Sequence, residues 1–151
     1  MSAASFKLRP YADADEKAAI ELWLRTWQET YPAIDFAERV DWWRKRWRAD
    51  LVTQATIVIA ESGETIVGFV TINPRSHYLD QIVVEPERWG QGIADALLAE
   101  AKRLSPDAID LHVNKDNVRA IRFYERHGFR YDGEDVNAVS GRPVNRMSWR
   151  R

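Results

Sequence analysis

The chain has 151 residues, a size that fits one domain (residues 1–151), and its 45% hydrophobic and 30% charged residues are typical of a soluble globule. Because 22 Lys and Arg balance 23 Asp and Glu, the net charge of -1 gives no general electrostatic reason to bind nucleic acid or an anionic membrane. The absence of cysteine excludes disulfides, thiolate metal sites and a cysteine-bound intermediate.

The N-terminal part predicts one strand and two helices. Residues 6–9 alternate up to Pro10 and read as a strand, after which Asp13 or Asp15 can cap a helix. Apolar residues then recur at helical spacing: Ile20, Trp23, Leu24 and Trp27. Tyr31-Pro32 ends this helix, and a second apolar stripe follows: Phe36, Val40, Trp43, Trp47 and Leu51. The basic run 44–48 inside the second helix is interpreted as a solvated face.

The remaining chain alternates between strands and helices. Strands are expected at residues 56–60, 65–72, 78–84, 108–113, 129–136 and 144–149, and helices at 93–104 and 117–127, with Gly128 as C-cap. The order β-α-α-β-β-β-α-β-α-β-β predicts an α/β fold with a mixed sheet and helices on both faces. The front hairpin should be antiparallel, and a strand-helix-strand unit near the end should be a right-handed parallel crossover.

Two features predict where the protein is found and what it does not bind. No stretch approaches the roughly 20 apolar residues that span a bilayer, and residues 1–10 lack the apolar core of a signal peptide. A cytoplasmic protein is therefore expected. The three histidines are scattered without metal-ligand spacing, so no metal is expected.

The turn between the strand at 78–84 and the next helix is the most informative segment. The connection between the strand and the helix contains two glycines and a small residue: Gly90, Gly92 and Ala94. Glycines permit close backbone approach, and the first N–H groups of a helix are unpaired and lie at the positive end of its dipole. Such a turn can bind phosphate through the backbone, although a tight connection that merely uses glycine has the same sequence. The spacing fits neither a Rossmann fingerprint nor a Walker loop.

This turn resembles motif A of the GCN5-related N-acetyltransferase (GNAT) superfamily, Gln/Arg-x-x-Gly-x-Gly/Ala. Gly92 and Ala94 match, whereas Trp89 stands in the place of Gln or Arg, and Arg88 or Gln91 can supply a polar contact instead. A second family pattern, L-x-V-x-x-x-N-x-x-A-x-x-F-Y-x-x-x-G-F, is met at every lettered position: Leu111, Val113, Asn117, Ala120, Phe123, Tyr124, Gly128 and Phe129.

The resemblance implies a GNAT-like acyl-CoA N-acyltransferase fold, acetyl-CoA as co-substrate and transfer of its acetyl group to an amine. The residues it implies for acetyl-CoA binding are Ile82, Val83, Val84, Trp89, Gly90, Gln91, Gly92, Ile93, Ala94, Asn117 and Tyr124. In this family the motif A strand splays from the next strand to form a slot for pantetheine, and a main-chain N–H within 82–84 would meet the carbonyl oxygen. Asn117 and Tyr124 share one helix face, although a helix cap and a core aromatic are the structural alternatives.

The chemistry of thiol departure suits a tyrosine at position 124. A departing thiolate needs a proton, and a phenol has an ordinary pKa of about 10, close to that of a thiol. The base that takes the proton of the amine is left open between His112 and Asp80, with Glu85 behind them. An imidazole, with an ordinary pKa of about 6.5, suits that task, and a carboxylate can act through a water.

The acceptor is less defined than the donor. In this family the first two helices and the loops around them commonly shape the acceptor site. The resemblance therefore implies acceptor-binding residues at the end of the first helix: Trp27, Glu29 and Tyr31. Core packing explains most of the other tryptophans. The acceptor is expected to be a small-molecule amine that attacks directly in a ternary complex. A protein N-terminus or lysine, and a non-catalytic acyl-CoA-binding module, are the alternatives. The resemblance also leaves a homodimer open.

Overall fold

A computed structural model describes residues 5–138 and 140–151. The signal-peptide expectation for residues 1–10 therefore falls partly outside the described residues. The strands are β1 (Lys7–Pro10), β2 (Thr56–Ser62), β3 (Thr65–Asn73), β4 (Tyr78–Val84), β5 (Ala108–Asn114), β6 (Arg130–Val136) and β7 (Pro143–Arg150). The helices are α1 (Glu16–Thr30), α2 (Val40–Arg46), α3 (Val52–Gln54), α4 (Ile93–Leu104) and α5 (Val118–Arg126), with the short helical segments η1 (Asp13–Asp15), η2 (Phe36–Arg39), η3 (Trp47–Leu51) and η4 (Pro86–Arg88).

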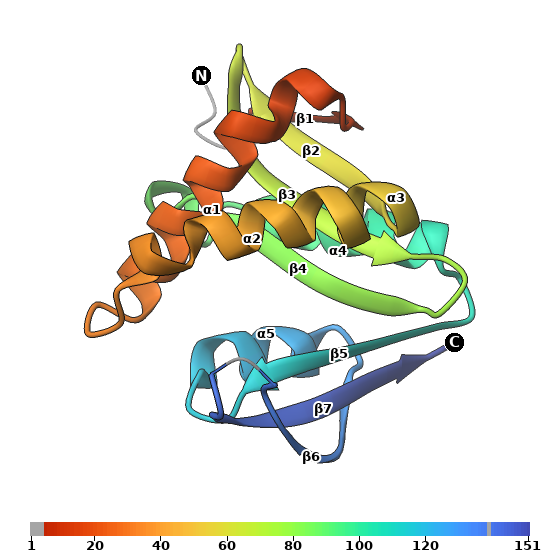
Figure 1. Cartoon of the computed structure of the whole chain (residues 1–151). Helices are drawn as coiled ribbons and strands as arrows, with labels where there is room; N and C mark the ends of the chain where they lie inside the picture. Colours follow the sequence, from red (N-terminus) through yellow and green to blue (C-terminus); the bar gives the residue numbers. More distant parts are fainter. Residues whose placement is uncertain (1–4, 139) are drawn as a thin grey trace.

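The strands form one mixed sheet of 7 strands in the order β1-β2-β3-β4-β5-β7-β6. β1 to β4 are antiparallel neighbours, β4 and β5 are parallel, and β5, β7 and β6 are antiparallel neighbours. α1 and α2 cover one face, and α4 lies on the other (Figure 1). The predicted element order, the antiparallel hairpin and a parallel strand-helix-strand unit are therefore confirmed.

The alternation of side chains along β2 divides the core between the two faces. Ile57 and Ile59 pack with α1 and α2, whereas Val58 and Ala60 pack with α4. This follows from the period of two in an extended strand, since successive side chains point to opposite faces. The tryptophan-rich helices thus have a core of their own on one side of the sheet.

Two local details differ from the sequence-based expectations. The second predicted helix is one helical stretch from η2 to α3 that changes its winding, with a π-helical segment at η3, and Trp43, Trp47 and Leu51 remain buried throughout. Asp15 occupies the N-cap position of α1, but its side chain does not cap that helix. Its carboxylate instead forms a bidentate pair with Arg9, through contacts of 2.8 and 2.9 Å, and accepts a hydrogen bond from the Ala12 amide at 2.8 Å.

The sheet is split between β4 and β5. These strands pair in register only at Tyr78 and Asp110 among the described residues, and the Asp110 amide donates to the His77 carbonyl at 2.9 Å. Beyond this point they diverge toward their C-terminal ends (Figure 1). A β-bulge at Asp80, where β4 slips its register against β3, lies just beyond the start of the fork.

Candidate active site

The turn after β4 has the conformation that phosphate binding needs. Gly90 and Gly92 have φ values of 79° and 89°, and Gly92 is the N-cap of the 12-residue helix α4. A Cβ added at either glycine would meet nothing within 4 Å, so glycine is required by the backbone angle rather than by crowding. The open space above the turn leaves room for a ligand against the first amides of α4.

Trp89 is the residue that departs from the family pattern. Its side chain packs against the protein and does not supply the polar side-chain contact of a Gln or Arg. Its indole N–H donates to the Val84 carbonyl at 2.8 Å. The guanidinium of Arg119, from the first turn of α5, lies 3.9 Å from the centre of the indole ring. Burial, and the nearby charge of Arg126, lower the pKa of Arg119. An anion bound here would stabilise the charged guanidinium and so oppose this lowering of the pKa.

A donor cavity of about 450 Å³ opens beside this turn. It is lined by residues of α1, β4, the glycine turn and α5, among them three arginines: Arg88, Arg119 and Arg126. Arginine guanidinium groups and the amides of a helix N-terminus are the groups that bind pyrophosphate in proteins. The residues present therefore fit the phosphate-rich end of coenzyme A.

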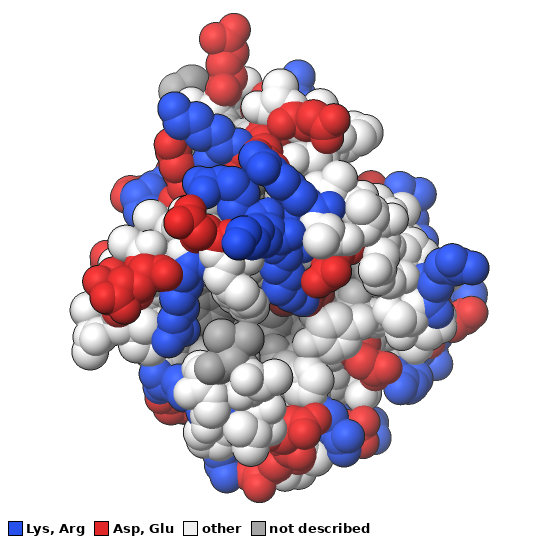
Figure 2. Space-filling model, viewed as in Figure 1, with Lys and Arg blue, Asp and Glu red and all other residues white. Residues whose placement is uncertain are grey.

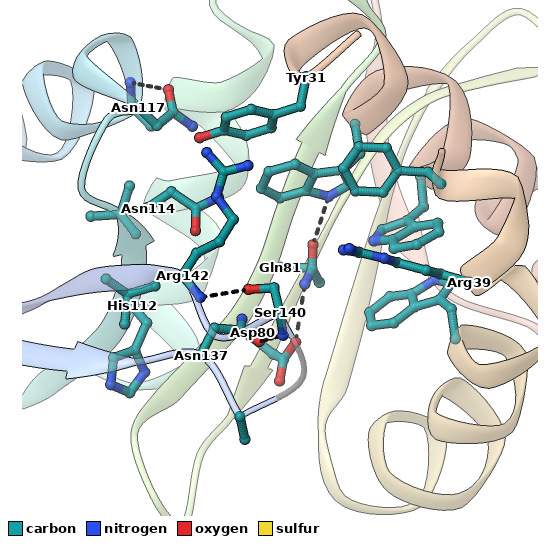
Figure 3. A pocket seen from close by; sticks show the side chains of 18 of the residues that line it. Tyr31, Arg39, Asp80, Gln81, His112, Asn114, Asn117, Asn137, Ser140 and Arg142 are labelled. Atoms are coloured by element: carbon teal, nitrogen blue, oxygen red, sulfur yellow. Dashed lines mark hydrogen bonds between the residues drawn. The ribbon is translucent and has the colours of Figure 1, made fainter. Parts of the chain in front are cut away.

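A second, acceptor cavity of about 520 Å³ lies on the other side of the fork. Its wall is rich in aromatic rings, among which Trp23 and Trp43 stack with centroids 4.7 Å apart. Trp27 and Tyr31 stack at 6.0 Å, and the Trp27 indole N–H donates to Gln81 at 3.3 Å (Figure 3). The tryptophans of the N-terminal region therefore both form a core and line a cavity.

The two cavities meet at a shared set of residues. These are Trp27, Ile82, Asn117, Ala120 and Tyr124. Asn117 also caps α5 by accepting a hydrogen bond from the Ala120 amide at 3.3 Å, so the alternative of a helix cap is correct without removing Asn117 from the site.

Tyr124 is the buried phenol at this junction. It is 7% exposed, and its hydroxyl has no hydrogen-bond partner among the residues that the structure describes. Burial, with a smaller contribution from Tyr78, raises the pKa of Tyr124 above the ordinary phenol value. The hydroxyl therefore stays protonated at neutral pH and is free to donate to a ligand.

The candidate bases on the acceptor side have different environments. Asp80 is held by Arg46, whose Nη1 lies 2.9 Å from one carboxylate oxygen, and by Gln81 at 3.2 Å. His112 lies on β5, with Nδ1 2.7 Å from the Tyr78 hydroxyl and Nε2 3.3 Å from an oxygen of Asp135. Burial raises the pKa of Tyr78 to about 12, so this phenol is neutral and donates to His112.

A polar link crosses the rim of the acceptor cavity. The Tyr31 hydroxyl donates to one oxygen of Asp116 at 2.8 Å, and Arg142 donates to the other at 2.7 Å. The Arg142 guanidinium also lies 4.7 Å from the centre of the Tyr31 ring. The end of α1, the loop after β5 and the turn before β7 are thereby tied together over the cavity.

Comparison with known proteins assigns the family. The model of the "Acetyltransferase (GNAT) family" matches residues 16–129. The chain belongs to the GNAT acetyltransferase family. Both sequence motifs and the two strands of the fork, β4 and β5, lie within this match, so the expected family, fold and class of enzyme are confirmed.

Three similar proteins illustrate the range of this GNAT family. The peptidyl-lysine N-acetyltransferase YjaB of Salmonella typhimurium is 26% identical over 82% of this chain and 83% of its own length. A mycothiol acetyltransferase of Kineococcus radiotolerans is 33% identical over 58% of this chain, which spans only 30% of that protein. The PaiA N-acetyltransferase of Thermoplasma acidophilum, solved with coenzyme A, superposes with a TM-score of 0.77 at 20% identity, covering 97% of this chain and 99% of that one.

Several residues predicted from the sequence do not reach either cavity. Glu29 is exposed and lines neither of them. Glu85 is held by Arg25 at 3.1 Å and by Arg88 at 3.0 Å, away from both. Ile93 is buried in the core and Gln91 contacts the Glu87 carbonyl, so in the glycine turn only their backbone is available to a ligand.

Several residues at the two sites were not predicted from the sequence, among them Tyr78, Asp135, Arg119 and Arg142. Tyr78 and Arg119 belong to segments already singled out, and Arg119 is one position before Ala120 of the second motif. Asp135 and Arg142 reach the site from β6 and the following turn, and no local pattern announces this.

The described residues, 5–138 and 140–151, contain neither a membrane-spanning helix nor a metal-binding cluster. None of their helices combines the length and apolar character needed to cross a bilayer. Their His, Asp and Glu side chains form no group of three or more that could hold a metal ion.

Proposed function

We propose that this protein transfers the acetyl group of acetyl-CoA to the primary amine of a small molecule, in a ternary complex and without an acetyl-enzyme. The observation that carries the proposal is Tyr124, a buried phenol without a partner among the described residues, which lines both cavities where they meet. A cavity of about 520 Å³ is also within the usual range for a small-molecule site.

Each part of the fork has a role in this reaction. The glycine turn and the arginines of the donor cavity hold the phosphates, so the thioester lies between β4 and β5. A β4 amide within 82–84, on the edge unpaired with β5, donates to the carbonyl oxygen as negative charge develops there. The side chains of Trp27 and Asn117 border the passage to the acceptor.

The bond changes balance as follows. The neutral amine nitrogen attacks the thioester carbon, and the new C–N bond forms as the C–S bond breaks. Tyr124 donates its proton to the departing sulfur, and the amine nitrogen loses a proton to a base. The products are the N-acetyl amine and coenzyme A, and solvent restores the proton of Tyr124.

We propose His112 as that base, ahead of Asp80. The Asp80 carboxylate is engaged by Arg46 and Gln81, whereas Nδ1 of His112 accepts a hydrogen bond from the neutral Tyr78 hydroxyl, through which a proton can reach it from the acceptor cavity. The Tyr78 oxygen can take the amine proton while the Tyr78 hydroxyl proton moves to Nδ1 of His112. The other ring nitrogen, Nε2, lies 3.3 Å from an oxygen of Asp135. Asp80 then serves to position Arg46 in the wall.

The test is thiol release from acetyl-CoA with a panel of small amines, a lysine-containing peptide and a no-amine control. We expect small amines to give turnover well above the control and above the peptide. Turnover with the peptide alone would transfer the proposal to a protein acceptor. Binding of acetyl-CoA without release by any amine would favour a non-catalytic module.

A further inference from the structure

Charge in the acceptor cavity is compensated unevenly. Of its lining cations, Arg46 is paired with Asp80 and Arg142 with Asp116. Arg39 also lines the cavity and is half-buried, yet no carboxylate lies within ion-pair distance of it among the described residues. Its guanidinium lies 5.4 Å from the centroid of the Phe36 ring. A guanidinium kept without a counter-ion in a partly buried cavity is suited to an anionic ligand.

The direction of this side chain supports the same reading. Figure 3 shows Arg39 reaching from the helical wall toward the middle of the cavity, on the side of Gln81, while His112 lies on the opposite wall. His112 and Asp135 form the part of that wall where the amine would lose its proton. The cavity therefore has a cationic wall and a basic wall that face each other across aromatic rings.

The surface outside the cavity has the same sign on the helical side. Figure 2 shows Lys and Arg gathered on this face of the molecule with acidic residues among them. The members on α2 and η3 are in part neutralised, since Arg44 pairs with Asp41 and Arg48 with Glu16. The prediction of a solvated face is therefore correct for Lys45 and Arg48, which are exposed, but not for Arg46, which pairs with Asp80 and lines the cavity. Arg39 differs from Arg46 because no carboxylate of the described residues lies within ion-pair distance of it.

We infer that the acceptor is an amine that also carries a carboxylate and an apolar or aromatic body, as in an amino acid with a large apolar side chain. Arg39 binds the carboxylate, the stacked rings of α1 and α2 hold the apolar body, and the amino group faces His112. This inference rests on the proposed function and adds the class of acceptor to it. A planar carboxylate matches the fork of a guanidinium through two N–H groups.

Matched acceptors test this inference. kcat/KM for thiol release is measured with tryptophan and tryptamine, and with phenylalanine and phenethylamine, which differ only in the carboxylate. The wild-type protein should prefer the amino acid in each pair. In Arg39→Gln that preference should fall by about 10- to 100-fold, the range for a lost charged hydrogen bond.

The control is Arg44→Gln, which removes a neighbouring arginine that lines neither cavity and should retain the preference. If wild type acetylates the decarboxylated amines as well as the amino acids, the inference is wrong while the proposed function stands. The same holds if Arg39→Gln keeps the full preference. If neither member of any pair causes release while a lysine peptide does, both the inference and the small-molecule proposal are wrong.

Discussion

The two cavities on either side of the β4–β5 fork are built from different parts of the chain. The donor cavity is bordered by backbone, namely two glycines with positive φ and the first amides of α4, together with the side chains of three arginines. The acceptor cavity depends on side chains brought from α1, η2, α2, β4, β5 and the turn before β7. Only a few residues, Tyr124 among them, belong to both.

This difference has a physical consequence for variation. A backbone site tolerates a change of side chain, so Trp89 in the place of the Gln or Arg of the family pattern is compatible with it. It does not tolerate the loss of a required backbone angle. A side-chain site behaves in the opposite way, because one substitution can alter the acceptor while leaving donor binding intact. Substitutions on the two sides should therefore affect donor binding and acceptor choice separately.

The largest effect is expected where the cavities meet. Tyr124→Phe removes only a hydroxyl that no described residue binds, so folding should be preserved, while the departing sulfur loses its proton donor. We expect kcat to fall by about 100-fold or more and the Kd for coenzyme A, from calorimetry, to change by less than about threefold. Tyr131→Phe, at a tyrosine 61% exposed, is the control. An equal loss in binding and turnover would show that Tyr124 is structural.

On the acceptor side, His112→Ala should lower kcat at neutral pH by about 10- to 100-fold, because the base is lost. The coenzyme A affinity should not change. His127→Ala, at a histidine that lines neither cavity, is the control. An unchanged kcat in His112→Ala would exclude His112 as the base.

The donor site could be predicted from the sequence more fully than the acceptor site. The donor site follows from contiguous motifs, since a strand, a glycine turn and a helix bring their own backbone into place. The acceptor site is assembled from distant segments, so Asp135 and Arg142 could be found only once β7 was placed beside β5 and β6 beside β7. Arg39 belongs to none of the sequence motifs, and only the fold shows that it lines the cavity without a carboxylate of the described residues within ion-pair distance.

On the donor side, Gly92→Ala should weaken coenzyme A binding by about tenfold, because a side chain at φ 89° costs about 1–2 kcal/mol and shifts the turn. Acceptor preference should stay as in the wild type. Gly63→Ala is a matched control, with φ 63° and open space in the β2–β3 turn. It should lose similar stability and keep its coenzyme A affinity. Normal affinity in both variants would mean that the glycine turn does not hold the donor.

The smallest effect concerns stability at high pH. Phenols of the unfolded chain ionise near pH 10, whereas burial keeps Tyr124 and Tyr78 neutral in the folded state. The free energy of unfolding should therefore be insensitive to these groups below about pH 10 and fall as the pH rises toward 12. Urea unfolding should show a shallower fall in Tyr124→Phe and an unchanged one in Tyr131→Phe. The same slope in all three proteins would place Tyr124 in contact with water.

The proposed reaction requires that the fork between β4 and β5 hold the donor, and a crystal structure with bound coenzyme A tests this directly. We predict the pyrophosphate on the amides of residues 90–94, the pantetheine between β4 and β5, and the sulfur within hydrogen-bonding distance of the Tyr124 hydroxyl. Coenzyme A bound elsewhere, or a Tyr124 hydroxyl turned away from the sulfur, would contradict it.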